Sequence, residues 1–342
     1  GEDHTYFKRQ MGPFSQHFRV ISVDTRGHGE SPRGTAPFTL EQFAEDLKEF
    51  LDGRSITRCH LLGFSDGGNI ALLFALKYPE YVEKLILHPR HIEVQILADS
   101  QGHVIHLGER DCSIQRKNQK LMEESPARGL TPALREQMGR DAVLAAEAAG
   151  YVGAGTIEFV MDQEGHYYFI EMNTRIQVEH PVTELVSGLD LIKEQIRVAA
   201  GEKLSVTQDD IHIQGHAIEC RINAENPAKN FMPCPGKITN IHIPGGNGVR
   251  VDTHIYNEYK VPANYDSMLM KLIVHGKDRA EAIAKMRSAL GELIIEGIDT
   301  NLDFQFEILS NPVYQDGHKI DTGFIPDQFP DLTYSLARNI EQ

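Results

Sequence analysis

The sequence predicts a chain of several domains, in which an α/β segment built on a parallel sheet precedes two α+β segments. Three observations predict this order. Residues 17–87 alternate apolar strand-like runs with helical ones, residues 167–181 alternate polar and apolar positions, and short β-like runs recur from Ile211. Strand–helix–strand order is typical of parallel sheets with right-handed crossovers, and period-two alternation is typical of a strand with one polar face.

Composition and charge limit the partners of this 342-residue chain. Hydrophobic residues make up 41% of the sequence, which is enough for the cores of two or three domains. A formal net charge of −15 argues against nucleic acid or an anionic membrane as a partner. No apolar run approaches the roughly 18 residues of a membrane span, and the four cysteines lack metal-ligand spacing. We therefore expect a cytoplasmic protein with reduced thiols.

The first segment, residues 1–87, has the pattern of a parallel sheet. His17–Asp24 is apolar and β-branched, and Phe38–Leu51 has apolar residues at helical spacing with Thr39 as its cap. A third apolar run, Cys59–Leu62, precedes the helical stretch NIALLFALKYPE and the strand-like VEKLIL. These residues predict the order strand, helix, strand, helix, strand.

Between the second strand and the second helix lies a G-x-S-x-G motif centred on Ser65. Its glycines permit the sharp turn of a nucleophile elbow, and together with VDTRGHGES it makes this segment resemble the α/β-hydrolase fold. That family places an acid and a histidine after the serine, and no position here matches either. Ser65 is then a vestigial hydrolase nucleophile, and the alternative is a purely structural remnant.

Two candidate strands, Gly155–Asp162 and Tyr167–Pro181, are joined by a short polar loop. If they form a hairpin with a four-residue loop, Glu158 lies opposite Glu171. Two facing carboxylates repel, so the arrangement predicts a hard cation between them, Mg²⁺ or Mn²⁺, which usually also holds phosphates. The alternation would also place Asn173, Arg175, Gln177 and Glu179 on the same strand face. The alternative is an ordinary solvated face.

The stretch EMNTRIQVEHPVTE, from Glu171 to Glu184, resembles the active-site signature of biotin carboxylase, the ATP-dependent component of acetyl-CoA carboxylases. RHIEVQ, GERDCSIQRKNQK and ECRINAE resemble other segments of that family, in the expected order. The resemblance covers residues 88–325. It implies the second half of an ATP-grasp domain over 88–205, the carboxylase C-terminal domain over 206–325, and a tail over 326–342.

The resemblance implies ATP-dependent carboxylation of biotin, a step of fatty acid biosynthesis. ATP activates bicarbonate as carboxyphosphate, which then delivers CO₂ to the ureido nitrogen of biotin. The implied cofactors are ATP and Mg²⁺, with biotin as carboxyl acceptor. The implied partners are bicarbonate, free biotin or a biotinylated carrier protein, carboxyltransferase subunits, and a second copy in a homodimer.

Residue by residue, the resemblance assigns the metal–nucleotide complex to Glu158, Glu171 and Asn173. Arg175, Gln177 and the backbone of Val178 would hold bicarbonate, with Glu179 as its general base. Arg221 would stabilise charge on the biotin ureido oxygen, and Lys120 would contact the transferring phosphoryl group or bicarbonate. The remaining ATP-binding residues would be His91, Gln115 and Asn118 around the nucleotide, with Glu83, Lys84 and Ile86 in the adenine-reading hinge.

Several assignments have structural alternatives. Arg221 could be an ion-pair partner, Lys120 a solvated charge and His91 an ordinary strand residue, and the family usually has histidine where Asn118 stands. The family's glycine-rich loop and its two phosphate-covering lysines have no match, so the chain resembles a fusion of two truncated families. We expect weak ligand binding and slow or no turnover. The competing hypotheses are a Ser65 hydrolase and a chain without catalytic activity.

Overall fold

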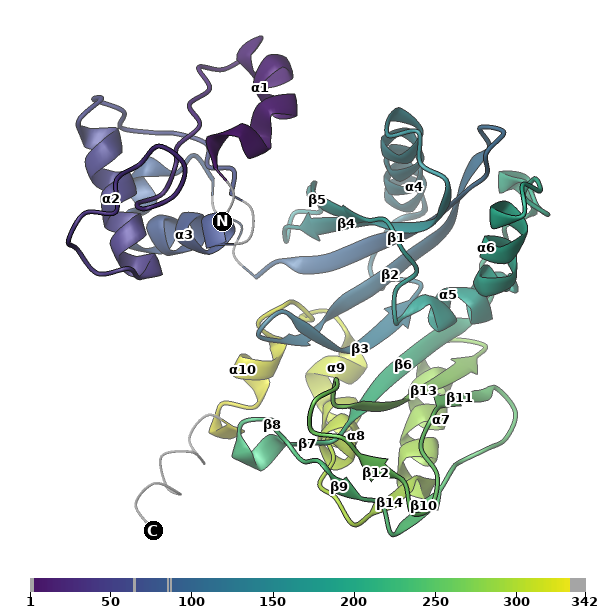
Figure 1. Ribbon diagram of the computed structural model, residues 1–342. Helices are drawn as coiled ribbons and strands as arrows, with labels where there is room; N and C mark the ends of the chain where they lie inside the picture. Colours follow the sequence, from purple (N-terminus) through teal and green to yellow (C-terminus); the bar gives the residue numbers. More distant parts are fainter. Residues whose placement is uncertain (1–2, 64–65, 85, 87, 333–342) are drawn as a thin grey trace, which may run out of the picture. The chain divides into compact units, whose positions relative to one another are not determined.

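The computed structural model describes residues 3–63, 66–84, 86 and 88–332, and it divides the chain into two compact units, Gly1–Leu87 and His88–Gln342 (Figure 1). No described helix is both long enough and apolar enough to cross a membrane. All four cysteines are free thiols.

The first unit is built mainly from helices. They are η1 (His4–Phe7), α1 (Lys8–Ser15), α2 (Leu40–Asp52), α3 (Asp66–Lys77) and η2 (Pro79–Tyr81). The Thr39 hydroxyl accepts a hydrogen bond from the backbone N–H of Gln42 at 3.2 Å, so α2 begins at the predicted cap. Ala44 and Leu51 of α2 pack with Phe74 of α3 in a small buried cluster.

The parallel sheet predicted for this unit is not formed by the described residues. The prediction of a strand over His17–Asp24 is wrong, because these residues form no strand and pair with no other segment in the described part of the chain. One parallel bridge, between Cys59 and Val82, links the chain before α3 to the chain after η2. An apolar β-branched run becomes a strand only when a neighbour completes its hydrogen bonds. Ser65 lies outside the described residues, and the hydrolase-like fold stays a prediction.

The second unit is organised around an eight-stranded antiparallel sheet in the order β11-β13-β6-β3-β2-β1-β4-β5 (Figure 1). Its strands are β1 (Arg90–Ala98), β2 (Val104–Arg116), β3 (Gln119–Ser125), β4 (Gly153–Met161), β5 (Tyr167–Asn173), β6 (His216–Asn223), β11 (Val249–Thr253) and β13 (Met268–Gly276). Because β3 pairs with β6, the segments 88–205 and 206–325 contribute to one continuous sheet.

The helices of this unit are α4 (Pro132–Ala148), α5 (His180–Ser187), α6 (Leu191–Ala199), α7 (Arg279–Glu292), α8 (Leu302–Ser310), α9 (Pro312–Asp316) and α10 (Phe324–Gln328), with 3₁₀ turns η3 (Gln208–Asp210) and η4 (Pro227–Lys229). Three two-stranded ribbons complete it: β7 (Glu225–Asn226) with β8 (Met232–Pro233), β9 (Gly236–Lys237) with β12 (Lys260–Val261), and β10 (Asn240–His242) with β14 (Ile294–Glu296).

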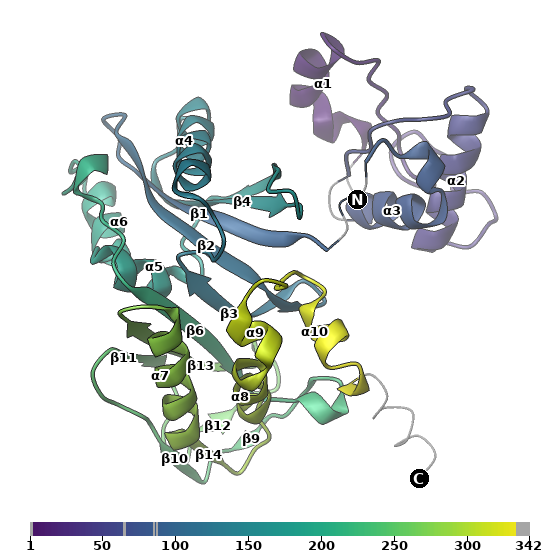
Figure 2. The same cartoon turned by 180° about the vertical axis from the view of Figure 1, so that it is seen from behind.

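The two faces of the large sheet differ in character. On the core face, Ile92, Val94 and Ile96 of β1 pack under α4, and Ile218 and its apolar neighbours on β6 pack under α7 and α8 (Figure 2). Alternate residues of the same strands point to the other side. We call that side the site face; α5 and α6 cover part of it, and Glu93 of β1 and Arg221 of β6 lie on it.

Candidate functional site

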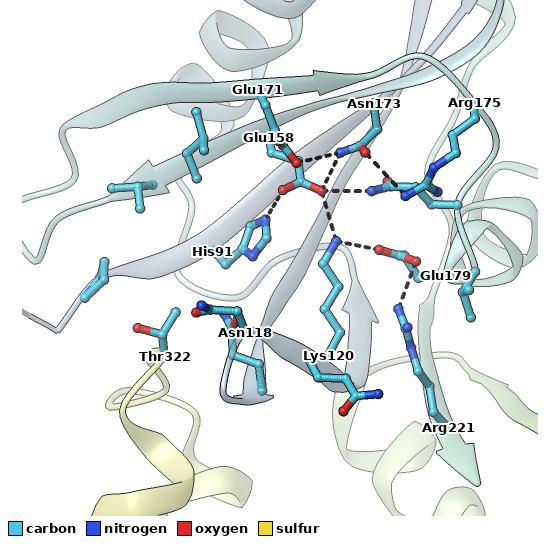
Figure 3. Close-up of a pocket in the computed structure, with 17 residues that line it drawn as sticks. His91, Asn118, Lys120, Glu158, Glu171, Asn173, Arg175, Glu179, Arg221 and Thr322 are labelled. Atoms are coloured by element: carbon cyan, nitrogen blue, oxygen red, sulfur yellow. Dashed lines mark hydrogen bonds and ion pairs between the residues drawn. The ribbon is translucent and has the colours of Figure 1, made fainter. Parts of the chain in front are cut away.

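A cavity of about 550 Å³ opens on the site face of the second unit (Figure 3). Its lining includes the residues predicted for metal, nucleotide, bicarbonate and biotin from this part of the chain: His91, Gln115, Asn118, Lys120, Glu158, Glu171, Asn173, Arg175, Gln177, Val178, Glu179 and Arg221. Residues spread over 130 positions of sequence therefore converge on one space.

A row of charged residues runs across four strands at the cavity. Arg110 of β2 is the register partner of Glu93 on β1. Glu93 also pairs with Glu158 on β4, and Glu158 pairs in turn with Glu171 on β5. The last pairing confirms the predicted partnership of Glu158 with Glu171. The predicted pairing of Asp162 with Tyr167 is wrong, because a β-bulge after Glu158 shifts the register and Tyr167 pairs with Met161. Because register partners project from the same face of a sheet, the four side chains form one line from the buried centre to the exposed edge.

Asn173 lies between the two carboxylates at the edge. Its side-chain Nδ2 donates to Glu158 Oε1 at 2.9 Å and to Glu171 Oε1 at 3.2 Å. Burial would raise the pKa of Glu158, but the hydrogen bond with His91 and the charge of Lys120 outweigh it and hold that pKa at about 2. An ionised carboxylate, a second carboxylate and an amide whose oxygen can turn inward form an all-oxygen donor set that suits Mg²⁺.

The strand does not continue through the whole predicted stretch. β5 ends at Asn173, and the chain turns so that α5 begins at His180. Arg175 therefore stands exposed at the rim, while Gln177 and Glu179 are buried. The prediction that all five polar residues share one strand face is wrong beyond Asn173, because the turn replaces the extended backbone. His180 Nδ1 lies 2.8 Å from the carbonyl oxygen of Gln177 and fixes this turn.

Lys120 reaches from β3 into the centre of a carboxylate cluster. Its Nζ lies 2.6 Å from Glu179 Oε1 and 3.1 Å from Glu158 Oε1 (Figure 3). It also lies 2.6 Å from Glu93 Oε2. Burial alone would lower the pKa of this amine, but the surrounding carboxylates raise it. Lys120 is therefore a fixed cation, and the alternative of a solvated surface charge does not describe it.

Glu179 is held between two cations. Lys120 contacts its Oε1, and Arg221 Nη2 donates to its Oε2 at 3.0 Å. Arg221 also donates through Nε to Glu123 Oε1 at 2.7 Å. The side chain of Glu179 is 2% exposed, so its orientation is set by these two contacts rather than by water. Arg221 is therefore an ion-pair partner, which was the structural alternative to its predicted catalytic role, and it also lines the cavity.

Glu93 and Arg110 form the support that the sequence did not predict. Arg110 is fully buried, and its guanidinium donates to Glu93 Oε1 at 2.6 Å and to Gln177 Oε1 at 3.0 Å. Gln177 in turn donates to Glu158 at 2.8 Å. Burial favours loss of the proton from Arg110, but Glu93 outweighs it and raises the pKa of the guanidinium. Glu93 lies in the segment RHIEVQ and Arg110 in GERDCSIQRKNQK. Only the pairing of β1 with β2 brings them together, and the sequence pattern did not show that pairing.

His91 and Asn118, predicted to lie around the nucleotide, line the part of the cavity away from Arg221 (Figure 3). His91 Nε2 lies 2.9 Å from Glu158 Oε2, and Gln115 and Asn118 border the tight turn between β2 and β3. Lys117 and Asn118 both have positive φ, at 49° and 63°, the conformation of a type I′ hairpin turn. Asparagine adopts it more readily than most residues, which gives Asn118 a structural reason to stand there.

The roles predicted for the hinge residues and for the backbone of Val178 stay predictions. Glu83, Lys84 and Ile86 belong to the first unit, and their role at the adenine stays a prediction. Val178 lines the cavity, and its carbonyl oxygen accepts a hydrogen bond from Lys271 Nζ at 3.0 Å. Its N–H is the group that the family resemblance directs at bicarbonate.

Comparison with known proteins identifies the family. The model of the carbamoyl-phosphate synthase L chain ATP binding domain matches residues 48–207, and that of the biotin carboxylase C-terminal domain matches residues 219–327. The crystal structure of the biotin carboxylase subunit of a pyruvate carboxylase is 40% identical, with a TM-score of 0.72, and the match covers 86% of this chain and 69% of that one. This chain belongs to the biotin carboxylase family.

Other members are similar over the same region. A biotin carboxylase from Nostoc sp. is 57% identical over 247 residues, covering 72% of this chain and 55% of that protein. The biotin carboxylase domain dimer of Hydrogenobacter thermophilus 2-oxoglutarate carboxylase, in complex with MgADP, ADP and bicarbonate, is 45% identical with a TM-score of 0.71, covering 78% of this chain and 59% of that one. The chain spans about half the length of the curated biotin carboxylases that it matches.

The first family match begins at residue 48, inside the segment predicted to be hydrolase-like. The carboxylase similarity therefore includes part of the first unit. Neither the hydrolase-like fragment nor a fusion of two families gains support from these comparisons.

Proposed function

We propose that the second unit binds bicarbonate and a magnesium nucleotide and serves the ATP-dependent carboxylation of biotin. The observation that carries the proposal is Glu179, a buried carboxylate fixed between Lys120 and Arg221 at the floor of the cavity. A base flanked by two cations suits an anionic substrate, because the cations attract bicarbonate while the carboxylate accepts its proton.

The edge of the charged row is the proposed metal and nucleotide end. Glu158, Glu171 and Asn173 would hold Mg²⁺, which supplies charge neutralisation at the phosphate oxygens when bound. His91, Gln115 and Asn118 would contact the nucleotide. Lys120 lies within hydrogen-bonding distance of both Glu158 and Glu179, so a single ammonium could serve the transferring phosphoryl group and bicarbonate.

Bicarbonate would lie between the rim and the floor. Arg175 is exposed at the cavity, where its guanidinium donates only to the Ile176 carbonyl at 3.2 Å and to Asn173 Oδ1 at 3.4 Å among the described residues. A planar guanidinium can bind a carboxylate-like anion through two hydrogen bonds. Gln177 and the N–H of Val178 would complete the binding site. Glu179 would take the bicarbonate proton, which leaves a dianion able to attack the γ-phosphorus of ATP.

Biotin would approach from the side of Arg221. As the carboxyl group transfers, negative charge develops on the ureido oxygen, and a nearby guanidinium stabilises it. The carboxyl acceptor would be biotin, free or on a carrier protein, and carboxyltransferase subunits would use the product. The dimer of the Hydrogenobacter thermophilus domain supports a homodimer as the assembly to test.

Bicarbonate binding tests the proposal. We expect ¹³C-labelled bicarbonate, titrated with MgADP present, to bind the parent chain and to bind Arg175→Ala about tenfold more weakly, the loss of one charge-assisted contact. The matched control is Arg140→Ala, which removes an exposed arginine of α4 paired with Glu136. Equal affinity in all three proteins would contradict the proposed site.

A further inference from the structure

Two buried carboxyl groups lie side by side behind Arg221. Glu123 on β3 and Glu219 on β6 are direct register partners, so both project from the site face with their Cβ atoms roughly 5 Å apart. Glu123 is 1% exposed and Glu219 is fully buried. Like charges at this separation, without water, destabilise each other strongly, so the two groups cannot both be ionised at little cost.

The hydrogen bonds of the pair are unequal. Arg221 contacts Glu123 Oε1 through Nε at 2.7 Å and through Nη2 at 2.5 Å. Three oxygens of the pair have no hydrogen-bond partner among the described residues: Glu123 Oε2 and both carboxyl oxygens of Glu219. A buried carboxylate without a donor is costly, whereas a protonated carboxyl carries its own donor. The cation therefore stabilises the charge on Glu123, and the proton belongs on Glu219.

The ionisable groups around Glu219 agree with this assignment. They are Glu123 on β3, Arg221 on β6, Lys271 on β13, and Glu179 at the N-cap of α5. Burial, and then the charge of Glu123, raises the pKa of Glu219 well above its usual value, because Lys271 and Arg221 compensate only in part. Lys271 is engaged by the Val178 carbonyl and by Asp252 at 3.5 Å. Burial also raises the pKa of Glu123, to about 7.

We propose that Glu219 is held as a neutral carboxylic acid that donates its hydroxyl hydrogen to Glu123 and thereby positions Arg221 at the cavity. The proton satisfies Glu123 Oε2 and one oxygen of Glu219 together. Glu123 remains an anion and holds Arg221 through Nε and Nη2, and Nη2 stays in contact with Glu179. Glu219 is a positioning residue, since it acts on the cavity only through Glu123 and Arg221.

The effect of this acid on bicarbonate or biotin rests on the proposed function, but its protonation and its hold on Arg221 do not. Both can be measured on the chain without any ligand. A failure of carboxylation or of bicarbonate binding is therefore distinguishable from a failure of this inference.

Infrared spectroscopy tests the proton. In the parent chain at pH 8, where ordinary carboxyl groups are ionised, we expect the C=O band of a protonated carboxylic acid. Glu219→Gln, which keeps the size and a donor, should lose that band. Absence of the band from the folded parent at pH 8, or its persistence in Glu219→Gln, would overturn the assignment of the proton to Glu219.

Nuclear magnetic resonance of ¹⁵N-arginine tests the positioning. The Nε–H signal of Arg221, assigned with Arg221→Lys, should exchange with solvent at a similar rate in the parent and in Glu219→Gln. It should exchange about tenfold faster in Glu219→Leu, which fills the space without a donor. Glu123→Gln gives the exchange rate expected when the carboxylate that contacts Arg221 Nε is removed.

An ionised Glu219 would give the opposite result. Both Glu219→Gln and Glu219→Leu would then remove a repelling charge, strengthen the contact of Glu123 with Arg221, and slow the exchange. That outcome, or equal rates in all the variants, would overturn the positioning role. If Glu219→Leu does not fold, as judged by circular dichroism, Glu219→Met replaces it with a flexible apolar side chain of similar volume.

Discussion

The two faces of the large sheet are stabilised by different interactions, although the same strands build both. On the core face, Ile92, Val94 and Ile96 of β1 pack on α4, and burial of apolar surface is the main stabilising term. On the site face, the intervening Glu93 and Gln95 are equally buried and are held by Arg110. One strand thus carries a hydrophobic core and an ionic network on alternate residues.

The two faces should therefore respond differently to mutation. When a buried apolar side chain is truncated, its neighbours relax and fill part of the cavity that it leaves. A buried charge cannot lose its partner in the same way, because the remaining ion stays uncompensated in a medium of low dielectric constant. Mutations of similar size should therefore cost more unfolding free energy on the site face than on the core face.

Arg110→Leu should produce the largest loss. The change removes the buried cation that contacts Glu93, Gln95, Thr183, Thr156 and Gln177. Breaking a buried pair costs about 3–5 kcal/mol in the free energy of unfolding, measured by urea denaturation. Arg140→Leu, at an exposed ion pair, should change it by less than about 0.5 kcal/mol. A loss below 1 kcal/mol for Arg110→Leu would erase the contrast between the faces.

Met138→Ala should be the largest effect on the core face. This α4 side chain is fully buried against β1 and β4, and truncating a buried methionine costs about 3 kcal/mol. Leu144→Ala, which truncates a 60% exposed residue of the same helix, should cost less than about 1 kcal/mol. Bicarbonate affinity should be unchanged in both. Weaker bicarbonate binding in folded Met138→Ala would show that the faces are coupled.

The consecutive residues Glu123 and Glu124, which lie on opposite faces of the sheet, respond to pH in opposite directions. Glu124 lies on the core face, where burial would raise its pKa, but the hydrogen bonds of His216 and Arg279 hold it at about 2. A carboxyl group with a lowered pKa contributes stability above pH 4.5 that is lost as the pH falls toward 2. The raised pKa values of Glu123 and Glu219 act in the other direction, since they cost stability as the pH rises.

Urea denaturation at several pH values measures this difference. Between pH 6 and pH 3 the parent should lose about 2 kcal/mol more unfolding free energy than Glu124→Gln, which has no proton to gain. Between pH 5 and pH 8, Glu219→Gln should lose less stability than the parent. Identical pH profiles for the parent and Glu124→Gln would mean that His216 and Arg279 do not favour the ionised carboxyl group.

The sequence predicted the parts of this architecture that depend on near neighbours. The pairing of Glu158 with Glu171 followed from period-two alternation and a short hairpin loop, although a bulge shifts the register next to that loop, and the cap of α2 followed from Thr39. The family signature brought the residues from His91 to Arg221 to one site. Local pattern and motif therefore identified most of the cavity lining.

Long-range pairing could not be predicted in the same way. The contact of Arg110 with Glu93 and Gln177 requires β1 to lie between β2 and β4, and Glu123 meets Glu219 only because β3 pairs with β6 nearly 100 residues later in the chain. The predicted strand over His17–Asp24 is wrong for the converse reason. Its residues have the composition of a strand, but no described segment pairs with them.

Glu171→Gln should give the smallest change in stability and a change confined to ligand binding. Glu171 stands on the exposed edge strand, where no buried charge depends on it, so the free energy of unfolding should move by less than about 0.5 kcal/mol. The variant loses one carboxylate of the Glu158–Glu171 pair, and we expect Mg²⁺–ADP to bind about tenfold more weakly by calorimetry. Asn118→His, which keeps a donor but strains a positive-φ turn, should change that affinity less. If Glu171→Gln and the parent bind Mg²⁺–ADP equally, Glu171 is not a metal ligand. Glu158 and its buried neighbours would then be sufficient to bind the metal without it.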